Sequence, residues 1–248
     1  MAEVVIVTGG SRGIGAAIAR LAARRGYAVA VNYQSKREAA DAVVRDIERS
    51  NGRAIAIAAD VSREPDVLKL FEEVDRRLGR VSALVNNAGV VDRSARVEQI
   101  TAERLARMFG INVAGSFLCA REAVKRMSRR HGGSGGAIVN LSSIAAKLGG
   151  AGDYVDYAAA KGAIDTFTVG LAKEVGPEGI RVNAVRPGVI RTEIHATSGD
   201  PGRAERIGAT APLARAGEAD EVARAVLWLL SEEASYITGA ILDVSGGR

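Results

Sequence analysis

A glycine-rich segment that follows an apolar run constrains the fold of this chain more than any other feature. Val4 to Thr8 is a continuous run of strand length, typical of a parallel strand that is buried on both faces. Residues 9–15 follow as Gly-Gly-Ser-Arg-Gly-Ile-Gly, and a helical pattern continues from them to about Arg25. Glycines here permit a tight turn and the close approach of a pyrophosphate, which then lies at the helix N-terminus. The sequence therefore predicts a dinucleotide-binding loop.

Strand-like and helical patterns alternate along the rest of the chain. Further strands are expected at Ala28 to Tyr33, Arg53 to Ala59, Ala83 to Val85, 137–141, Arg181 to Val185 and Ala240 to Val244. Further helices are expected at about Lys36 to Ser50, Glu64 to Leu78, Ala102 to Arg130, 154–175 and Asp220 to Leu230. Such alternation builds a parallel sheet through right-handed crossovers. We therefore expect one doubly wound Rossmann-type α/β domain over residues 1–248, with a parallel seven-stranded sheet between two helical layers.

Composition and charge exclude several classes of protein. Hydrophobic residues make up 47% of the chain, which can supply a full core, and no segment is an apolar run long enough to cross a membrane. The first strand begins within a few residues of Met1, which leaves no room for a signal peptide. Cys119 is the only cysteine, and His131 and His195 lack metal-ligand spacing. We expect a soluble, cytoplasmic protein without a metal site.

The net charge of +5 raises the question of nucleic acid as a partner. The basic residues are spread over several helical segments, and only 4% of the residues are aromatic, too few to favour a base-stacking platform. Solvated helix faces are the better interpretation, so no nucleic-acid partner is expected.

The segment after the second expected strand bears on the choice of cofactor. NAD-specific sites usually place an acidic residue there, about 20 residues beyond the glycine loop, to bind the ribose 2′-hydroxyl. Here no carboxylate occurs until Glu38, whereas Arg12 lies inside the glycine loop and Lys36 and Arg37 follow the strand. A guanidinium group suits a phosphate. An ordinary solvated helix start explains Lys36 and Arg37 equally well. Arg12 is more specific, so we expect NADP(H) rather than NAD(H).

Tyr157 and Lys161 are candidates for catalysis. They are four residues apart, which places both on one face of a helix. A neighbouring ammonium group should lower the pKa of the phenol and so make Tyr157 a proton donor and acceptor near neutral pH. The preceding strand brings Ser142 and Ser143 to its C-terminal end, where ligands bind in such sheets, and alternation puts these serines on opposite faces. Taken alone, the tyrosine and lysine could also be a common surface pair.

Five motifs occur together in sequence order. They are Gly9-x3-Gly13-x-Gly15, Asn86-Asn87-Ala88-Gly89, Ser143, Tyr157-x3-Lys161 and Pro187-Gly188-x3-Thr192. Over essentially the whole chain, this ordered set resembles the classical short-chain dehydrogenase/reductase family, and most closely its bacterial 3-oxoacyl-reductase-like and glucose-dehydrogenase-like members. The resemblance implies an oxidoreductase that transfers hydride between a nicotinamide cofactor and a carbonyl or secondary alcohol substrate. It also implies dinucleotide binding mainly in 1–115 and catalytic and substrate elements mainly in 137–215.

The resemblance assigns four catalytic roles. Tyr157 would be the acid/base, and Lys161 would lower the pKa of Tyr157 and hold the nicotinamide ribose hydroxyls. Ser143 would donate a hydrogen bond to the substrate oxygen. Asn112 would position a water for proton relay. Independently, glycines at 110 and 115 interrupt the long helical pattern around Asn112, so a local distortion is expected there. Asn112 could instead be a tolerated polar residue of a buried helix.

Cofactor contacts follow from the same resemblance. Asp60 would accept from the adenine amino group, Asn86, Ala88 and Gly89 would line the adenosine side, and 187–192 would hold the carboxamide. Asp60 could otherwise cap a turn, and Asn86 and Asn87 could be purely structural. The full set of expected contacts is Gly9, Ser11, Arg12, Gly13, Ile14, Gly15, Asn32, Tyr33, Gln34, Ser35, Asp60, Val61, Asn87, Ala88, Gly89, Tyr157, Lys161, Pro187, Gly188, Ile190 and Thr192.

Two segments bear on the substrate. The spacing from Ser143 to Tyr157 is one residue longer than is most common in the family, so the loop 145–156 is expected to carry an insertion. Within it, Tyr154 lacks a lysine four residues later. Residues 191–212 would close over the substrate, with His195 a solvent-exposed loop residue rather than a substrate contact. A sugar, a 3-oxoacyl thioester, a steroid and a small diketone all remain open as substrates.

Partners and alternatives complete the expectations. The helices at 102–130 and 154–175 correspond to those that pack across two-fold axes in the family, so a homotetramer or dimer is expected. The main alternatives are a non-catalytic NADP(H) sensor and an NAD-dependent sugar or alcohol dehydrogenase. The intact set of Asn112, Ser143, Tyr157 and Lys161 favours an enzyme with a small-molecule carbonyl or alcohol substrate.

Overall fold

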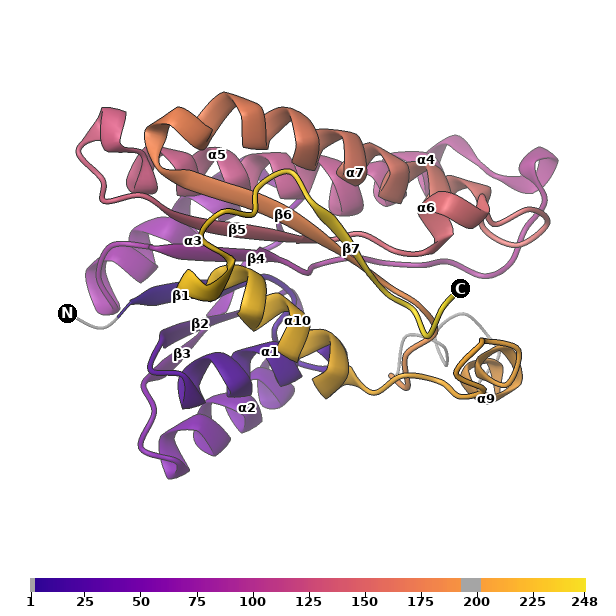
Figure 1. Ribbon diagram of the computed structural model, residues 1–248, viewed down its shortest axis with the longest axis horizontal. Coiled ribbons are helices and arrows are strands. Elements are labelled where there is room, and N and C mark those ends of the chain that lie inside the picture. The colour runs from indigo at the N-terminus through magenta and orange to yellow at the C-terminus, as the bar shows by residue number, and fades with distance from the viewer. Residues whose placement is uncertain (1–2, 193–201) are drawn as a thin grey trace.

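The computed structural model describes residues 3–192 and 202–248 and places one parallel sheet between two layers of helices (Figure 1). All strand pairs are parallel, and the order across the sheet is β3-β2-β1-β4-β5-β6-β7. The strands are β1 (Val4–Val7), β2 (Ala28–Tyr33), β3 (Ala54–Ala58), β4 (Ala83–Asn86), β5 (Gly136–Leu141), β6 (Ile180–Pro187) and β7 (Ile241–Val244). The expected seven-stranded Rossmann-type architecture is confirmed.

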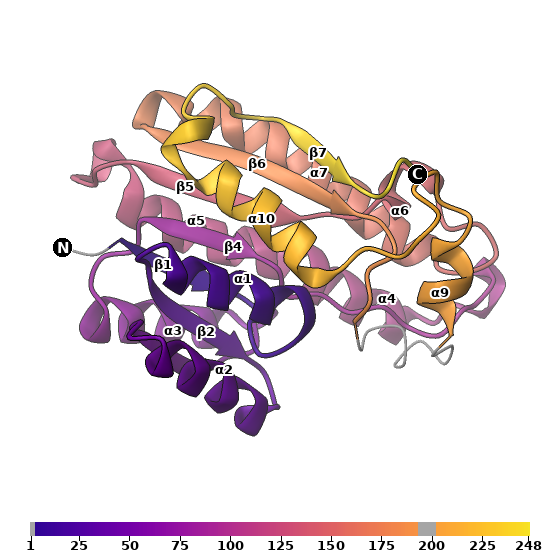
Figure 2. The same ribbon diagram turned by 60° about the horizontal axis from the view of Figure 1, so that its bottom comes forward.

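The helices divide between the two faces of the sheet. One face is covered by α1 (Gly13–Arg24), α2 (Arg37–Arg49) and α10 (Ala219–Leu230), and α1 and α10 lie side by side in Figure 2. The other face is covered by α3 (Glu64–Arg77), α5 (Gly115–Met127) and α7 (Val155–Val175), with α4 (Ala102–Phe109) leading into α5. Short elements are α6 (Ala145–Leu148), α9 (Arg203–Gly208), η1 (Val97–Gln99), η2 (Gly110–Ala114), η3 (Arg129–His131), η4 (Gly176–Glu178) and η5 (Glu232–Ala234).

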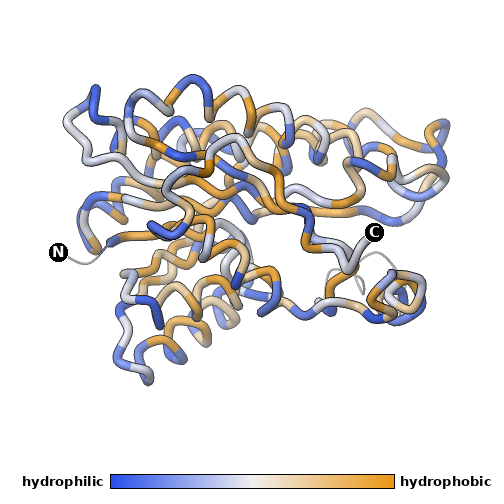
Figure 3. The backbone as a smooth tube through the Cα atoms, in the orientation of Figure 1, coloured by the Kyte–Doolittle hydropathy of each residue, from blue (hydrophilic) through white to orange (hydrophobic). Residues whose placement is uncertain are grey.

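Alternation along β1 explains how one strand serves two cores. Val5 and Val7 are fully buried against the α1, α2 and α10 layer, whereas Val4 and Ile6 are buried against the opposite layer. Figure 3 shows the apolar stretches along the central strands and the polar residues on outer helix faces and turns. A strand that is buried on both faces reads as a continuous apolar run, which is the pattern in the sequence.

The strand order reverses beside β1, which lies between β2 and β4. In open α/β sheets the crevice outside the carboxyl ends of the strands at such a switch point is where ligands bind. The glycine loop leaves β1 at this edge, and residues 86–91 leave β4 beside it.

The helix expected at 102–130 is broken into three parts. The π-helix η2 separates α4 from α5, as the glycines at 110 and 115 predicted, and α5 ends at Met127, before the expected boundary. A Cβ atom at Gly115 would lie 2.7 Å from Cγ2 of Val61, so glycine lets this helix approach the loop after β3.

Three expectations need correction or fall outside the described residues. The segment 145–156 is not wholly a loop, because it begins with the short helix α6, and the segment 191–212 contains the helix α9. His195 lies outside the residues that the structure describes. Among the described helices, none combines the length and apolar character needed to span a bilayer.

Candidate active site

The glycine loop between β1 and α1 is packed too closely to admit side chains. Gly9 has φ +62° and Gly13 has φ +52°, values that favour glycine. A Cβ atom at Gly15 would lie 2.4 Å from the carbonyl oxygen of Gly9 and 2.5 Å from Nδ2 of Asn87. The backbone of α1 therefore begins directly against the turn, and a helix N-terminus is a favourable position for an anionic ligand.

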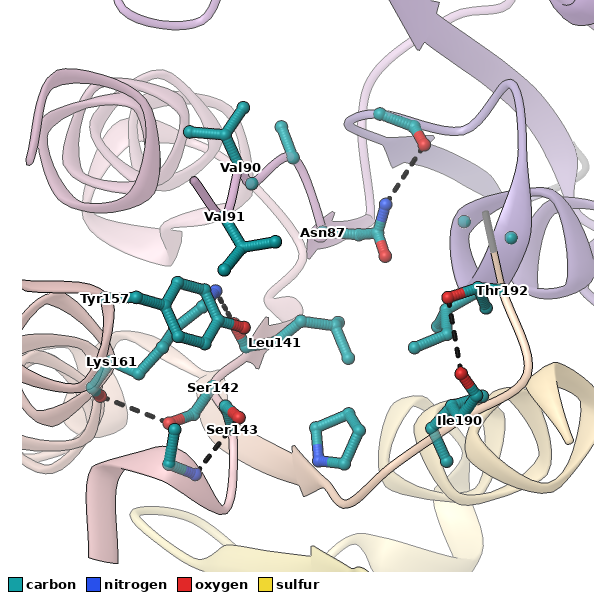
Figure 4. A pocket seen from close by; sticks show the side chains of 18 of the residues that line it. Asn87, Val90, Val91, Leu141, Ser142, Ser143, Tyr157, Lys161, Ile190 and Thr192 are labelled. Carbon is teal, nitrogen blue, oxygen red and sulfur yellow. Dashed lines mark hydrogen bonds between the residues drawn. The ribbon is translucent and has the colours of Figure 1, made fainter. Parts of the chain in front are cut away.

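Asn87 and Thr8 fasten the loop after β4 to the glycine loop. Nδ2 of Asn87 donates to the carbonyl oxygens of Thr8 at 2.8 Å and of Gly9 at 3.1 Å. In return, Oγ1 of Thr8 accepts from the backbone N–H groups of Asn87 and Ala88, both at 3.0 Å. Figure 4 shows Asn87 across the cavity from Tyr157. Asn87 therefore has the structural role that the sequence left open for it, and it also borders the cavity.

The side chain of Asn86 points away from the cavity, in the direction opposite to that of Asn87. The expectation that Asn86 lines the adenosine side is therefore corrected. Its side chain is buried, and Nδ2 donates to Oδ1 of Asn140 at 2.9 Å and to the carbonyl oxygen of Ser116 at 3.2 Å. Nδ2 of Asn140 in turn donates to Oγ1 of Thr168 on α7 at 2.9 Å. Successive strand residues point to opposite faces of the sheet, so only Asn87 of the pair reaches the cavity.

Asn32 and Asp60 organise the end of the cavity near β2 and β3. Oδ1 of Asn32 accepts from the N–H of Gly9 at 3.2 Å, and its Nδ2 donates to the carbonyl oxygen of Ala59 at 3.0 Å. Asp60 accepts from Ser62 N–H at 2.9 Å and from Nε2 of Gln34 at 2.8 Å. Burial would raise the pKa of Asp60, but the hydrogen bonds from Ser62 and Gln34 outweigh it and lower the pKa. Asp60 is thus held as a carboxylate in a turn, consistent with the capping role left open for it.

Ser143, Tyr157 and Lys161 come together on the opposite wall (Figure 4). Ser143 borders the cavity and shares a hydrogen bond with Tyr157. The Nζ of Lys161 lies 5.6 Å from the centroid of the Tyr157 ring and donates to the carbonyl oxygen of Leu141 at 2.6 Å. Ser142 is buried and donates to the carbonyl oxygen of Lys161 at 3.1 Å, so it secures the helix instead.

The electrostatics of this wall differ from the expectation. The pKa of Tyr157 is raised to about 12, because burial disfavours the phenolate more than the Ser143 hydrogen bond favours it. Burial likewise lowers the pKa of Lys161 to about 8, against the attraction of Asp165. The expected lowering of the Tyr157 pKa is therefore wrong for this structure. Near neutral pH, Tyr157 holds its proton and Lys161 is charged.

Asn112 is buried in η2 and does not border the cavity directly. Nδ2 of Asn112 donates to the carbonyl oxygens of Met108 and Val90, both at 3.0 Å, and Oδ1 accepts from Val90 N–H at 3.2 Å. A Cβ atom at Gly89 would lie 2.7 Å from Oδ1 of Asn112 and 3.6 Å from Nζ of Lys161. Asn112 thus secures the loop beside Lys161, and its role in a proton relay stays a prediction.

One cavity of about 940 Å³ joins these parts. Apart from Asn86, every expected cofactor contact borders it, as does Ser143. Among the described residues, no group of three or more His, Cys, Asp or Glu side chains could hold a metal ion.

Arg203 on α9 also borders the cavity, and the sequence did not single it out. Arg203 donates to the hydroxyl of Tyr154 at 2.9 Å, and its guanidinium carbon lies 5.1 Å from the centroid of that ring. It also pairs with Asp153, and Tyr154 meets Tyr157 edge-on at 5.7 Å between ring centroids. Only its place in the segment expected to close over the substrate could have drawn attention to Arg203.

Comparison with known proteins gives the family. A family model described as enoyl-(acyl carrier protein) reductase matches residues 9–248. The structure of a short-chain dehydrogenase from Burkholderia cenocepacia J2315 in complex with NADP superposes with a TM-score of 0.90 at 34% identity, covering 99% of this chain and 97% of that one. The chain belongs to the short-chain dehydrogenase/reductase family.

Membership in the short-chain dehydrogenase/reductase family confirms the resemblance drawn from the five motifs and makes the protein an oxidoreductase. The uncharacterized oxidoreductase YgfF of Escherichia coli is 54% identical over 245 residues, which cover 99% of each chain. The 3-oxoacyl-[acyl-carrier-protein] reductase of Homo sapiens is 41% identical over 247 residues, covering 100% of this chain and 98% of the human one.

Proposed function

We propose that the protein is an NADP(H)-dependent oxidoreductase that transfers hydride between the nicotinamide and a carbonyl or secondary alcohol substrate. The observation that carries this proposal is the position of Ser143, Tyr157 and Lys161 on one wall of a cavity that continues to the glycine loop. The close-packed glycines at 9, 13 and 15 suit a pyrophosphate at the N-terminus of α1, so the site fits a dinucleotide.

Residues of the protein supply the proton and position the substrate and the cofactor. NADPH, when bound, supplies the hydride. Tyr157 keeps its proton at neutral pH and donates it to the substrate oxygen as negative charge develops there. Ser143, already within hydrogen-bond reach of Tyr157, donates to the same oxygen and stabilises that charge. The Lys161 ammonium binds ribose hydroxyls and favours the phenolate that remains after proton transfer.

The preference for NADP(H) rests on the charges around the adenosine end of the cavity. Arg12, Ser35 and Lys36 border it there, and a guanidinium, a hydroxyl and an ammonium group suit a 2′-phosphate. Asp60, an acid bordering the same end, has its oxygens engaged by Ser62 and Gln34. The NADP complex of the Burkholderia relative supports this preference.

Arg12→Ala is expected to weaken NADPH binding by about 10- to 100-fold, because a charge-assisted hydrogen bond contributes about 1.5–3 kcal/mol. NADH affinity should change little, since NADH lacks the phosphate. Dissociation constants by cofactor fluorescence measure both, with the exposed Arg49→Ala on α2 as a matched control. Equal losses for the two cofactors would remove Arg12 from phosphate recognition.

The substrate is best found with a panel. Apolar side chains border the substrate end of the cavity: Val90, Val91, Ile144, Leu148, Val189 and Ile207. We propose assays of 3-oxoacyl and enoyl thioesters, diketones, quinones, aldoses and ketosteroids with NADPH and NADH, including the reverse reactions. Turnover of carbonyl compounds with NADPH supports the proposal. Faster turnover with NADH would favour the NAD-dependent sugar or alcohol dehydrogenase, and tight NADPH binding with no turnover would favour a sensor.

We further propose that the enzyme works in the cytoplasm as a homotetramer that packs through α4, α5 and α7. Leu105, Phe109 and Phe117 expose between 38% and 48% of their surface on α4 and α5, and Phe117 stacks on Phe167 of α7 at 3.7 Å between ring centroids. Phe117→Glu is expected to shift the mass from tetramer towards dimer or monomer in light scattering, because a buried unpaired charge is costly. An unchanged mass would place the interface elsewhere.

A further inference from the structure

A series of alternating charges extends from Lys161 over four secondary-structure elements. Asp165 lies one helical turn after Lys161 on α7, on the same face. Nε and Nη2 of Arg186 on β6 donate to Oδ2 of Asp165 at 3.0 Å and 2.7 Å. Nη1 of Arg186 lies 3.5 Å from Oδ1 of Asp243 on β7, which also pairs with Lys147 of α6.

Asp165 is unusual among these charged residues because it is buried and only one of its two carboxylate oxygens has a hydrogen-bond partner. Its residue is 8% exposed, and both hydrogen bonds from Arg186 reach the same oxygen, Oδ2. Among the described residues, Oδ1 of Asp165 is one of two buried side-chain polar atoms without a hydrogen-bond partner. An unsatisfied buried acceptor is destabilising, so its presence calls for a compensating role.

We propose that Asp165 is a positioning residue that keeps Lys161 charged inside the buried active site. This inference rests on the proposed function for its consequence in catalysis. Lys161 donates to the carbonyl oxygen of Leu141 and lies deep beside Tyr157, where a lone ammonium is disfavoured. Asp165 supplies the negative charge that offsets this burial, while itself remaining outside the cavity lining.

The charged groups of the elements around α7 have partners other than Lys161. Arg104 of α4 forms a bidentate pair with the fully buried side chain of Asp156, at 2.7 Å and 3.0 Å. Arg181 of β6 donates to the carbonyl oxygens of Leu229 and Leu230 at the far end of that strand. The packed segments of β5 and η2 carry no charged residues, and Lys147 of α6 is paired with β7 as described above.

The direction of the Lys161 pKa agrees with this arrangement. Burial lowers the pKa to about 8, and Asp165 is the charge that opposes the lowering. A lysine is charged below its pKa. Removal of Asp165 therefore moves the loss of the ammonium to lower pH, towards neutrality.

The direct test is a ¹³C NMR titration of the Lys161 side chain in the full-length protein without cofactor or substrate. Lysines are few enough to resolve after ¹³C labelling: Lys36, Lys69, Lys125, Lys147, Lys161 and Lys173. The Lys161 resonance is assigned by its loss in Lys161→Arg. Asp165→Asn is expected to lower the Lys161 midpoint by about one pH unit or more, because it removes the opposing charge. Asp165→Glu should restore the midpoint towards that of the wild type.

A second variant removes a positive charge instead of a negative one, so the Lys161 midpoint should move in the opposite direction. This variant keeps the inference testable if Asp165→Asn fails to fold. Arg186→Gln removes the positive charge that is paired with Asp165 and is expected to raise the Lys161 midpoint, because less of the Asp165 charge is then neutralised. Glu122→Gln is the control, because Glu122 is a buried, ion-paired acid on α5 away from the cavity, and its loss should leave the midpoint in place. An unchanged or raised midpoint in Asp165→Asn, or a lowered one in Arg186→Gln, would overturn the inference.

Activity provides a separate readout. In Asp165→Asn, the alkaline fall of kcat/KM should begin at lower pH by the same shift as the NMR midpoint, while activity on the acidic side, where Lys161 stays charged, is retained. A purely structural defect would lower kcat/KM equally at all pH values, which would contradict the inference. Because the NMR titration needs no turnover, its failure is distinct from a failure of the proposed reaction.

Discussion

Tyr157→Phe is expected to lower kcat by about a thousandfold or more, because it removes the general acid, whose contribution is typically about 10²–10⁴. The ring and its edge-on contact with Tyr154 remain, so the cavity keeps its shape. NADPH affinity should stay within about threefold, well under 1.4 kcal/mol, since the phenol hydroxyl is a small part of the cofactor contacts. Turnover is measured by NADPH absorbance at saturating substrate, and affinity by cofactor fluorescence.

Tyr154→Phe is the matched control for this variant. Tyr154 has a hydroxyl in the same cavity, but it accepts a hydrogen bond from Arg203 and has Ala158 four residues later in place of a lysine. Loss of the Tyr154 hydroxyl should affect KM more than kcat. If Tyr157→Phe kept its turnover, or if the two variants lost kcat equally, Tyr157 would not be the acid.

Gly15→Ala is expected to have the second large effect, on cofactor binding and on stability. The added Cβ would lie 2.4 Å from the Gly9 carbonyl oxygen and 3.0 Å from the Gly10 Cα, both backbone atoms, so the loop must shift. Overpacking of this kind costs about 1–3 kcal/mol in the free energy of unfolding. Displacement of the loop from the pyrophosphate position should weaken NADPH binding by at least about tenfold, equal to 1.4 kcal/mol. Denaturant unfolding and cofactor titration measure the two effects.

Gly170→Ala is the control for Gly15→Ala, because it shows the effect of replacing a helical glycine where there is no close packing. Gly170 lies in the middle of α7 on its exposed side, and an added Cβ atom would have no neighbouring atom within 4 Å. Alanine there should raise the free energy of unfolding by about 0.5–1 kcal/mol and leave NADPH affinity unchanged. Normal NADPH affinity in Gly15→Ala would mean that the glycine loop does not hold the cofactor.

Features with a local cause could be predicted from the sequence. The glycine loop follows from three glycines between a buried strand and a helix, and the π-helix follows from Gly110 and Gly115 within one helical pattern. The strand boundaries fall within two residues of the expectation, because strands that are buried on both faces are continuous apolar runs. Each of these signals lies within one segment of the sequence, so it can be recognised without knowing which other segment packs against it.

Features set by tertiary contact could not be predicted in this way. Asp165 and Arg186 meet only because α7 packs on β6, and neither residue has a local signal. Asn86 turns towards Asn140 because β4 pairs with β5, and α6 and α9 are too short to have a periodic pattern of their own. The raised pKa of Tyr157 likewise depends on burial, which the spacing to Lys161 does not reveal.

The most direct measurement of the central claim is the fate of deuterium from NADPH that carries deuterium in both positions at C4 of the nicotinamide, with a carbonyl compound from the panel and mass spectrometry of the product. The account predicts one deuterium at the carbinol carbon of the alcohol, a proton from solvent on its oxygen, and labelled product formed about a thousandfold more slowly with Tyr157→Phe. Deuterium on an alkene carbon, deuterium released to water, or an unlabelled alcohol would contradict carbonyl reduction at this site.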